Sequence, residues 1–219
     1  MQATRLILIR HAETEANVAN QVWQGSSDTP LTLRGERQVA ATAAHVATLH
    51  RRLAIDVFYG SPLPRARRTA DAISQIIRLP VQLDPALREF DLGDWEGRTF
   101  ADLEETEDLS NRWEANLHFA PPGGESPFMF QRRVVTAFER LASVHPSQTV
   151  LVVTHGAVIR NLLAIWIGNG PDDWRRWQAC NCSITMLERS DQTWYPVLLN
   201  YTSHLPLEAS VTKPEAHQV

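Results

Sequence analysis

Two histidines and two arginines of this chain lie where predicted strands end. Arg10 and His11 directly follow one apolar run, His155 follows another, and Arg65 lies on the first turn of a helix predicted after a third. An imidazole can act as a nucleophile or exchange protons. Guanidinium groups bind the oxygens of phosphate and carboxylate groups. These residue types predict chemistry on a small dianion, above all a phosphoryl group.

The elements that would position these side chains follow from hydrophobic periodicity. Strand-like and helix-like segments alternate, which is typical of an α/β layer architecture. Continuous apolar runs typical of buried parallel strands cover Leu6–Ile9, Ile55–Tyr59 and Val150–Val153. Helical spacing of apolar residues occurs over 32–50, 66–77, 125–143 and 158–166. Two later segments, Ser183–Leu187 and Pro196–Tyr201, resemble strands, the second antiparallel at an edge.

The three apolar runs deliver their polar residues to one place if the strands are parallel. The carboxyl ends of parallel strands lie along one edge of the sheet, where open α/β folds bind ligands. Thr154 and His155 end one run, and Ser61 ends another, before Arg65. A helix beginning at Gly156 would add free backbone N–H groups and the positive end of its dipole.

Other kinds of site are poorly supported. The chain has no H-x-x-x-H pair and no H-E-x-x-H run, and arginines beside His11 would repel a cation. Cys180 and Cys182 have a spacing that matches no common zinc site. There is no G-x-S-x-G motif for a serine nucleophile. We therefore expect no metal and no cofactor.

Length and composition limit the remaining classes. The 219 residues, 43% of them hydrophobic, suit one sizeable domain, and a net charge of −4 gives no basic surface for nucleic acid. No apolar stretch reaches about 18 residues, and the N-terminal run is too short for a signal peptide. A soluble, cytoplasmic protein without a membrane partner is the expectation, and a homodimer is left open.

Six ordered sequence blocks resemble the histidine phosphatase superfamily, also called the phosphoglycerate mutase-like family. "RHAETEAN" is similar to the family pattern R-H-G-E-[ST]-x-x-N, with Ala12 where glycine is commonest. The other blocks are "QGSSDTPLTLRGERQ", "SPLPRARRTA", "LREFDLGDWEGRTF", "PPGGES" and "VVTHGAVIR". They cover residues 10–160 in the expected order, and at Ala12 we expect a slight change of loop geometry without loss of activity.

The resemblance implies a histidine acid phosphatase type of enzyme that passes through a phosphohistidine. It implies that His11 is the nucleophile and that Glu89 donates a proton to the leaving oxygen and then activates water. The remaining implied catalytic residues, which bind the phosphoryl oxygens, are Arg10, Arg65 and His155. The implied substrate-binding residues are Asn17, Gln24, Gly25, Ser26 and Gly156.

The resemblance also implies a three-layer α/β/α sandwich with a mostly parallel central sheet. We expect one domain over 1–204, with a cap-like insertion at 90–124, and a mobile tail over 205–219. Within the insertion, Trp113 should line the leaving-group pocket, Trp95 should pack the insertion onto the core, and "PPGGES" should shape the entrance.

Two enzyme classes and one binding function share this residue set. The favoured reading is a phosphatase that hydrolyses a small phosphorylated metabolite, because the segment around Glu89 resembles the phosphatase branch and the chain is short. The alternative is a cofactor-dependent phosphoglycerate mutase. The mutases of the family carry a longer insertion around the proton donor than this chain has. A non-catalytic phospholigand-binding protein would be expected to lack His11, Glu89 or His155, and all three are present.

Overall fold

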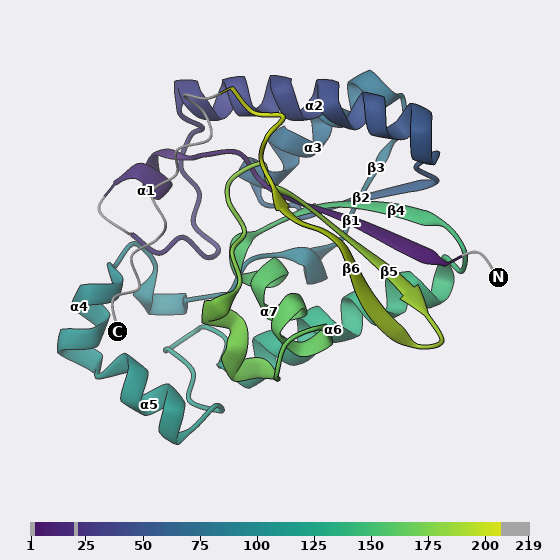
Figure 1. Cartoon of the computed structure of the whole chain (residues 1–219). Coiled ribbons are helices and arrows are strands. Elements are labelled where there is room, and N and C mark those ends of the chain that lie inside the picture. Colours follow the sequence, from purple (N-terminus) through teal and green to yellow (C-terminus); the bar gives the residue numbers. More distant parts are fainter. Residues whose placement is uncertain (1–2, 20–21, 207–219) are drawn as a thin grey trace.

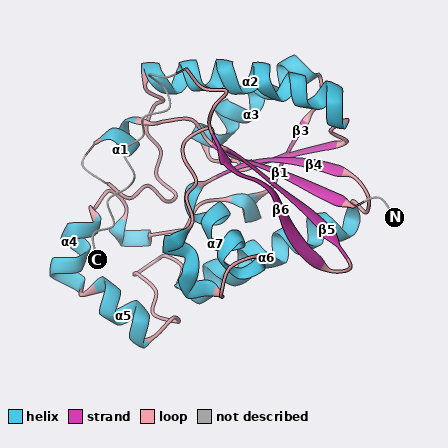
Figure 2. Ribbon diagram, in the orientation of Figure 1, coloured by secondary structure: helices cyan, strands magenta, loops and turns pink. Residues whose placement is uncertain are grey.

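The computed structural model describes residues 3–19 and 22–206, and in this part of the chain six strands form one sheet (Figures 1 and 2). The strand order is β3-β2-β4-β1-β5-β6. The first four of these strands are parallel, whereas β5 is antiparallel to β1 and β6 is antiparallel to β5. The strands are β1 (Thr4–Arg10), β2 (Val57–Gly60), β3 (Val81–Leu83), β4 (Thr149–Thr154), β5 (Ile184–Ser190) and β6 (Thr193–Tyr201).

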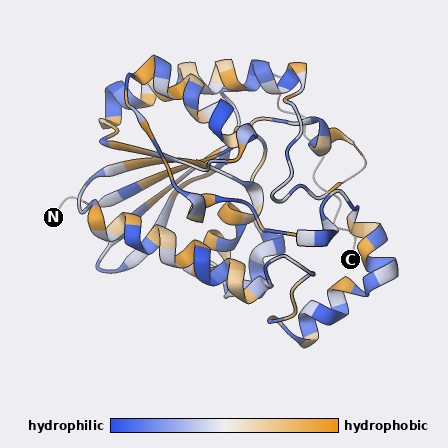
Figure 3. Ribbon diagram, turned by 180° about the vertical axis from the view of Figure 1, so that it is seen from behind, coloured by the Kyte–Doolittle hydropathy of each residue, from blue (hydrophilic) through white to orange (hydrophobic). Residues whose placement is uncertain are grey.

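Helices cover both faces of the sheet, which confirms the three-layer α/β/α architecture (Figure 1). Alternate residues of β1 pack in opposite directions: Ile7 and Ile9 against α2 and α3, and Leu6 and Leu8 against α6 and α7. Figure 3 shows the helices with mixed hydrophobic and hydrophilic residues, as expected for elements with one face on the core. The four helices are α2 (Leu33–Leu53), α3 (Pro64–Ile77), α6 (Pro127–Val144) and α7 (Gly156–Trp166).

The predicted strands and helices are all present, and the elements that were not predicted are short. The strand β3 has only three residues, which gives too little sequence for an alternating pattern. Helix α1 has four residues and is defined by a capping box, in which the side chains of Thr14 and Asn17 bond to each other's backbone N–H. The other short elements are α4 (Phe100–Glu107), α5 (Leu109–Ala115) and the 3₁₀ helices η1 (Pro85–Leu87), η2 (Gly93–Trp95) and η3 (Pro171–Arg176).

The expected insertion at 90–124 contains η2, α4 and α5, and Figure 1 shows α4 and α5 beyond the carboxyl ends of the parallel strands. It has a small hydrophobic cluster of its own, formed by Leu92, Trp95, Leu103 and Leu109. Trp95 is only 3% exposed and packs within this cluster of the insertion, whereas the prediction was that it packs the insertion onto the main core.

Most of the predicted mobile tail lies outside the described residues. Its first residue, Leu205, is described and is buried against Ala12, Val39 and Cys182, so the packed region extends past the predicted boundary at 204. Within residues 3–19 and 22–206, none of the helices is both long and apolar enough to span a membrane.

Candidate active site

His11 follows the last residue of β1, and both sides of its backbone are fixed by neighbouring segments. Its N–H donates to the carbonyl of Thr154, and its own carbonyl accepts from the side chain of Asn181 at 3.1 Å and from the N–H of Cys182. The ring Nδ1 lies 2.8 Å from the carbonyl of Ala12. Because a carbonyl can only accept, Nδ1 carries the proton, and in the neutral ring the lone pair is on Nε2.

His155 begins the turn from β4 into α7 and is completely buried. Its ring centroid is 5.2 Å from that of His11, so the two strand ends bring the histidines together as predicted. Its Nε2 lies 2.7 Å from Ser61 Oγ, whereas Nδ1 has no hydrogen-bond partner among the described residues. Burial, and next the charge of Arg65, lowers the pKa of His155 well below the ordinary 6.5, so the ring is neutral while the site holds no anion.

The two arginines are held in different ways. The Nη1 of Arg10 donates to the carbonyl of Ala179 at 2.8 Å. Arg65 is 2% exposed, and burial lowers its pKa from the ordinary value, while the nearby Glu89 acts in the opposite direction. The Nε of Arg65 is buried without a partner among the described residues. Its Nη atoms donate at 2.7–3.2 Å to the carbonyls of Gln24, Gly25 and Ser27 and to the carboxylate of Asp28.

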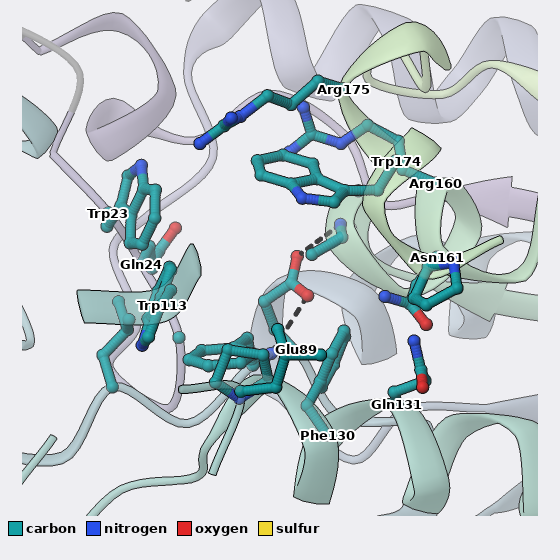
Figure 4. A pocket seen from close by; sticks show the side chains of 18 of the residues that line it. Trp23, Gln24, Glu89, Trp113, Phe130, Gln131, Arg160, Asn161, Trp174 and Arg175 are labelled. Carbon is teal, nitrogen blue, oxygen red and sulfur yellow. Dashed lines mark hydrogen bonds between the residues drawn. The ribbon is translucent and has the colours of Figure 1, made fainter. Parts of the chain in front are cut away.

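Glu89 lies at the N-terminus of α7, and Figure 4 shows both of its oxygens in hydrogen bonds. One oxygen accepts from the N–H of Ala157 at 3.1 Å and the other from the N–H of Phe90 at 3.0 Å. The segment that carries Glu89 is in turn held by Arg133, which pairs with Glu125 at 2.6 Å. Arg133 also donates to the carbonyls of Ala86, Arg88 and Glu89. The carboxyl group is therefore fixed at one end of the helix.

The loop at 24–27 is held from two sides. While its carbonyls accept from Arg65, its N–H groups face the carboxylate of Glu96, which accepts from Gly25 at 3.0 Å, Ser26 at 2.6 Å and Ser27 at 3.3 Å. Successive N–H groups on one anion form a nest. Ser26, predicted to bind substrate, is exposed and does not line the cavity, and its N–H is bonded to Glu96.

A cavity of about 420 Å³ opens beside the catalytic candidates. Among the predicted site residues, seven line it: Arg10, His11, Asn17, Gln24, Gly25, Glu89 and Gly156. His155 and Arg65 lie buried behind this surface. Trp113 lines the cavity as predicted, whereas the residues of "PPGGES" do not, and the following Pro127 and Phe128 do. Among the described residues, no group of three or more potential ligands could hold a metal ion.

Close packing explains the glycine at the helix start. A Cβ on Gly156 would lie 3.2 Å from Nε of Arg10. A larger residue at this position would therefore force the guanidinium to shift by a few tenths of an ångström. The alanine at position 12 needs no unusual backbone, since its φ is not positive. Its buried methyl group packs in the cluster with Val39, Cys182 and Leu205.

Asn181 is a site residue that sequence reasoning missed. It is 1% exposed, and its Nδ2 donates both to the carbonyl of His11 and, at 2.9 Å, to Oδ1 of Asn17. Asn17 also accepts from the N–H of Thr14, so its oxygen is occupied and its NH₂ group is the part that can donate to a substrate. No sequence motif indicates Asn181, because its partners lie more than 160 residues away.

The model of the histidine phosphatase superfamily (branch 1) matches residues 6–202 of the chain. This chain belongs to that superfamily. An adenosylcobalamin/alpha-ribazole phosphatase of Escherichia coli is 39% identical over 169 residues, which cover 75% of this chain and 79% of that protein. A probable phosphoglycerate mutase of Escherichia fergusonii is 33% identical and covers 87% of each chain.

Solved structures of the superfamily share the fold. A mycobacterial glucosyl-3-phosphoglycerate phosphatase has a TM-score of 0.76 and 28% identity, covering 90% of this chain and 99% of that one. Some relatives are longer: the chain spans 45% of a bifunctional protein of Mycobacterium tuberculosis, to which it is 38% identical over 168 residues. The relatives with named activities thus include phosphatases and a probable phosphoglycerate mutase.

Proposed function

We propose that this histidine phosphatase hydrolyses a phosphomonoester through a phosphohistidine on Nε2 of His11. The observation that carries the proposal is the orientation of the ring: Nδ1 is bonded to the carbonyl of Ala12, which places the lone pair on Nε2. Both His11 and Glu89 line the cavity, so a substrate in it can reach a nucleophile and a proton donor together.

In the first step, Nε2 of His11 attacks phosphorus, and the bond to the ester oxygen breaks. Glu89 in its protonated form gives its proton to that oxygen, so the product leaves as an alcohol. In the second step, the Glu89 carboxylate takes a proton from water, whose oxygen attacks phosphorus and releases His11 and inorganic phosphate. This is the histidine acid phosphatase type of chemistry.

Half-buried and buried side chains supply the donors that the phosphoryl oxygens need. Arg10 and Nε of Arg65 are the cationic donors, and Nδ1 of His155 is a neutral one. Preorganised donors of this kind are worth the most where water is excluded. Asn17 adds an amide donor at the rim.

Phosphoglycerate mutase activity is the alternative that one relative's name suggests. A mutase must keep water from its phosphohistidine. The cavity here has room for much more than phosphoglycerate, so water can reach the intermediate, and we favour hydrolysis. Alpha-ribazole phosphate and glucosyl-3-phosphoglycerate, named for relatives, are the first substrates to test.

The test is to trap the intermediate during turnover of a ³²P-labelled phosphomonoester. Acid-labile, base-stable label should appear on the wild-type protein and be absent from His11→Ala. His50→Gln, which changes a histidine at the far end of α2, is the matched control and should keep both label and activity. Near-native turnover by His11→Ala would rule out the proposed nucleophile.

A further inference from the structure

We infer that the outer part of the cavity binds a flat, unsaturated ring on the leaving alcohol, with a hydrogen-bond acceptor and a donor at its edges. This inference rests on the proposed function, because it concerns the part of the substrate that the phosphatase releases. The two can fail separately, as the experiment below shows.

Aromatic side chains form much of the wall of the cavity. In Figure 4, Trp23 and Trp113 lie to the left of Glu89, and the ring of Trp174 lies above it. Trp23 and Trp113 are stacked on each other, with centroids 5.9 Å apart and planes 18° apart, so they form one continuous wall. Phe90 and Phe130, in edge contact at 5.0 Å, also line the cavity.

Trp174 comes from η3, outside the insertion. Arg160 and Arg175 pack on its ring with their guanidinium carbons 5.1 and 5.3 Å from the centroid. Figure 4 shows Arg175 on the side of the ring away from Glu89. The arginine contacts hold the indole in place, and the ring face toward Glu89 is presented to the cavity.

Two buried polar atoms on this cavity lack partners within the described structure. Nε1 of Trp113 is a donor and Oδ1 of Asn161 is an acceptor, and both residues line the cavity. Buried polar groups are rarely left unpaired in folded proteins, which indicates that a ligand satisfies them. Trp113 and Asn161 lie on opposite sides of Glu89 in Figure 4.

The size of the cavity agrees with such a substrate. Its volume of about 420 Å³ falls within the range of sites that enclose small organic ligands, about 300–1,000 Å³. A phosphoryl group occupies only the end at His11. The remaining space is bounded mainly by aromatic and aliphatic side chains. A compact, carboxylate-bearing alcohol such as glycerate would leave much of that space unfilled.

The experiment compares phosphate release from four esters of primary alcohols, so that the basicity of the leaving oxygen is matched. The alcohols are 2-cyclohexylethanol, 2-phenylethanol, 2-(1-naphthyl)ethanol and 2-(indol-3-yl)ethanol. Phenylethyl phosphate should exceed cyclohexylethyl phosphate in kcat/KM by about 2- to 13-fold, the range expected for one aromatic contact. Indolylethyl phosphate should exceed naphthylethyl phosphate by a similar factor, because its N–H can donate to Asn161.

Variants locate the two contacts. Trp174→Leu should reduce the preference for the flat ring to less than about twofold, and Trp174→Phe should keep it. Asn161→Leu should remove the preference for indole over naphthalene while leaving the preference for phenyl over cyclohexyl. Trp177→Leu, which changes a tryptophan of the same segment that does not line the cavity, is the control and should behave as wild type.

Equal kcat/KM for the phenyl and cyclohexyl esters would overturn the inference while phosphate release continued to support the phosphatase. A flat-ring preference that survives Trp174→Leu would also overturn it, since the ring would then bind elsewhere. No release from any ester, p-nitrophenyl phosphate included, would instead refute the proposed function.

Discussion

Replacing Ser61 by alanine should impair catalysis by changing which nitrogen of His155 carries the proton. Ser61 Oγ accepts from the N–H of Leu63 at 3.3 Å, which directs the hydroxyl proton toward Nε2 of His155, 2.7 Å away. A neutral imidazole whose Nε2 accepts a hydrogen bond carries its proton on Nδ1. That Nδ1–H is then available to donate to a phosphoryl oxygen.

The size of the effect follows from the burial of the pair, since both Ser61 and His155 are 0% exposed. Without the hydroxyl, Nε2 no longer accepts a hydrogen bond and takes the proton, which turns Nδ1 into a lone pair facing the anion. An unpaired buried group costs about 1–3 kcal/mol, and a hydrogen bond to a charged group is worth about 1.5–3 kcal/mol. We therefore expect kcat/KM to fall by about 10- to 150-fold.

Two measurements check the reasoning. Steady-state kinetics with an alkyl phosphate gives kcat/KM, and ¹⁵N chemical shifts of the histidine ring nitrogens report the tautomer directly. Ser143→Ala, which removes an exposed hydroxyl from α6, is the control. A loss below about threefold, or a His155 that keeps its Nδ1 proton in Ser61→Ala, would refute the assigned role.

Two other predictions follow from the same structure. Glu89→Gln should slow the single-turnover phosphorylation step much more for alkyl than for p-nitrophenyl phosphate, because only the alkoxide needs a proton; equal deficits would remove Glu89 from the acid role. The pKa of His204 is lowered to about 4, mainly by burial and next by His45, so the ring is neutral when folded, and its contribution to stability is complete above pH 6.5 and lost as the pH falls toward 4. The free energy of unfolding in urea, measured at pH 7 and pH 4.5, should fall by about 1–2 kcal/mol more in the wild type than in His204→Gln, after allowing for partial exposure of the ring. Parallel pH profiles of the two proteins would contradict this.

The convergence of the histidines could be predicted because it depends only on strand direction. His11 and His155 each follow a long apolar run, and parallel neighbours put such residues at one edge. The parallel pairing of β2 with β4 places Ser61 there by the same rule. These features need no knowledge of side-chain packing.

The residues that fix the site could not be predicted, because they act on distant backbone groups. Glu96 accepts from N–H groups about 70 residues earlier, and Arg133 donates to carbonyls 44–47 residues earlier. In sequence, both look like ordinary surface charges. Trp174 was missed for a related reason: η3 has no hydrophobic periodicity, and its place on the cavity depends on how the chain returns from α7 toward β5.

The segment that leads into β5 gives His11, the proposed nucleophile, a particular place in the order of synthesis. Arg10 is held by the carbonyl of Ala179, 169 residues later, and His11 by Asn181, 170 residues later. At about 5–20 residues per second, a ribosome needs roughly 8–34 s to make the intervening chain. The residues that will hold His11 do not yet exist during that time, although His11 itself was among the first residues made. Catalytic competence should therefore be among the last properties that a newly made molecule acquires, and activity reports completed folding rather than folding of the parallel strands alone.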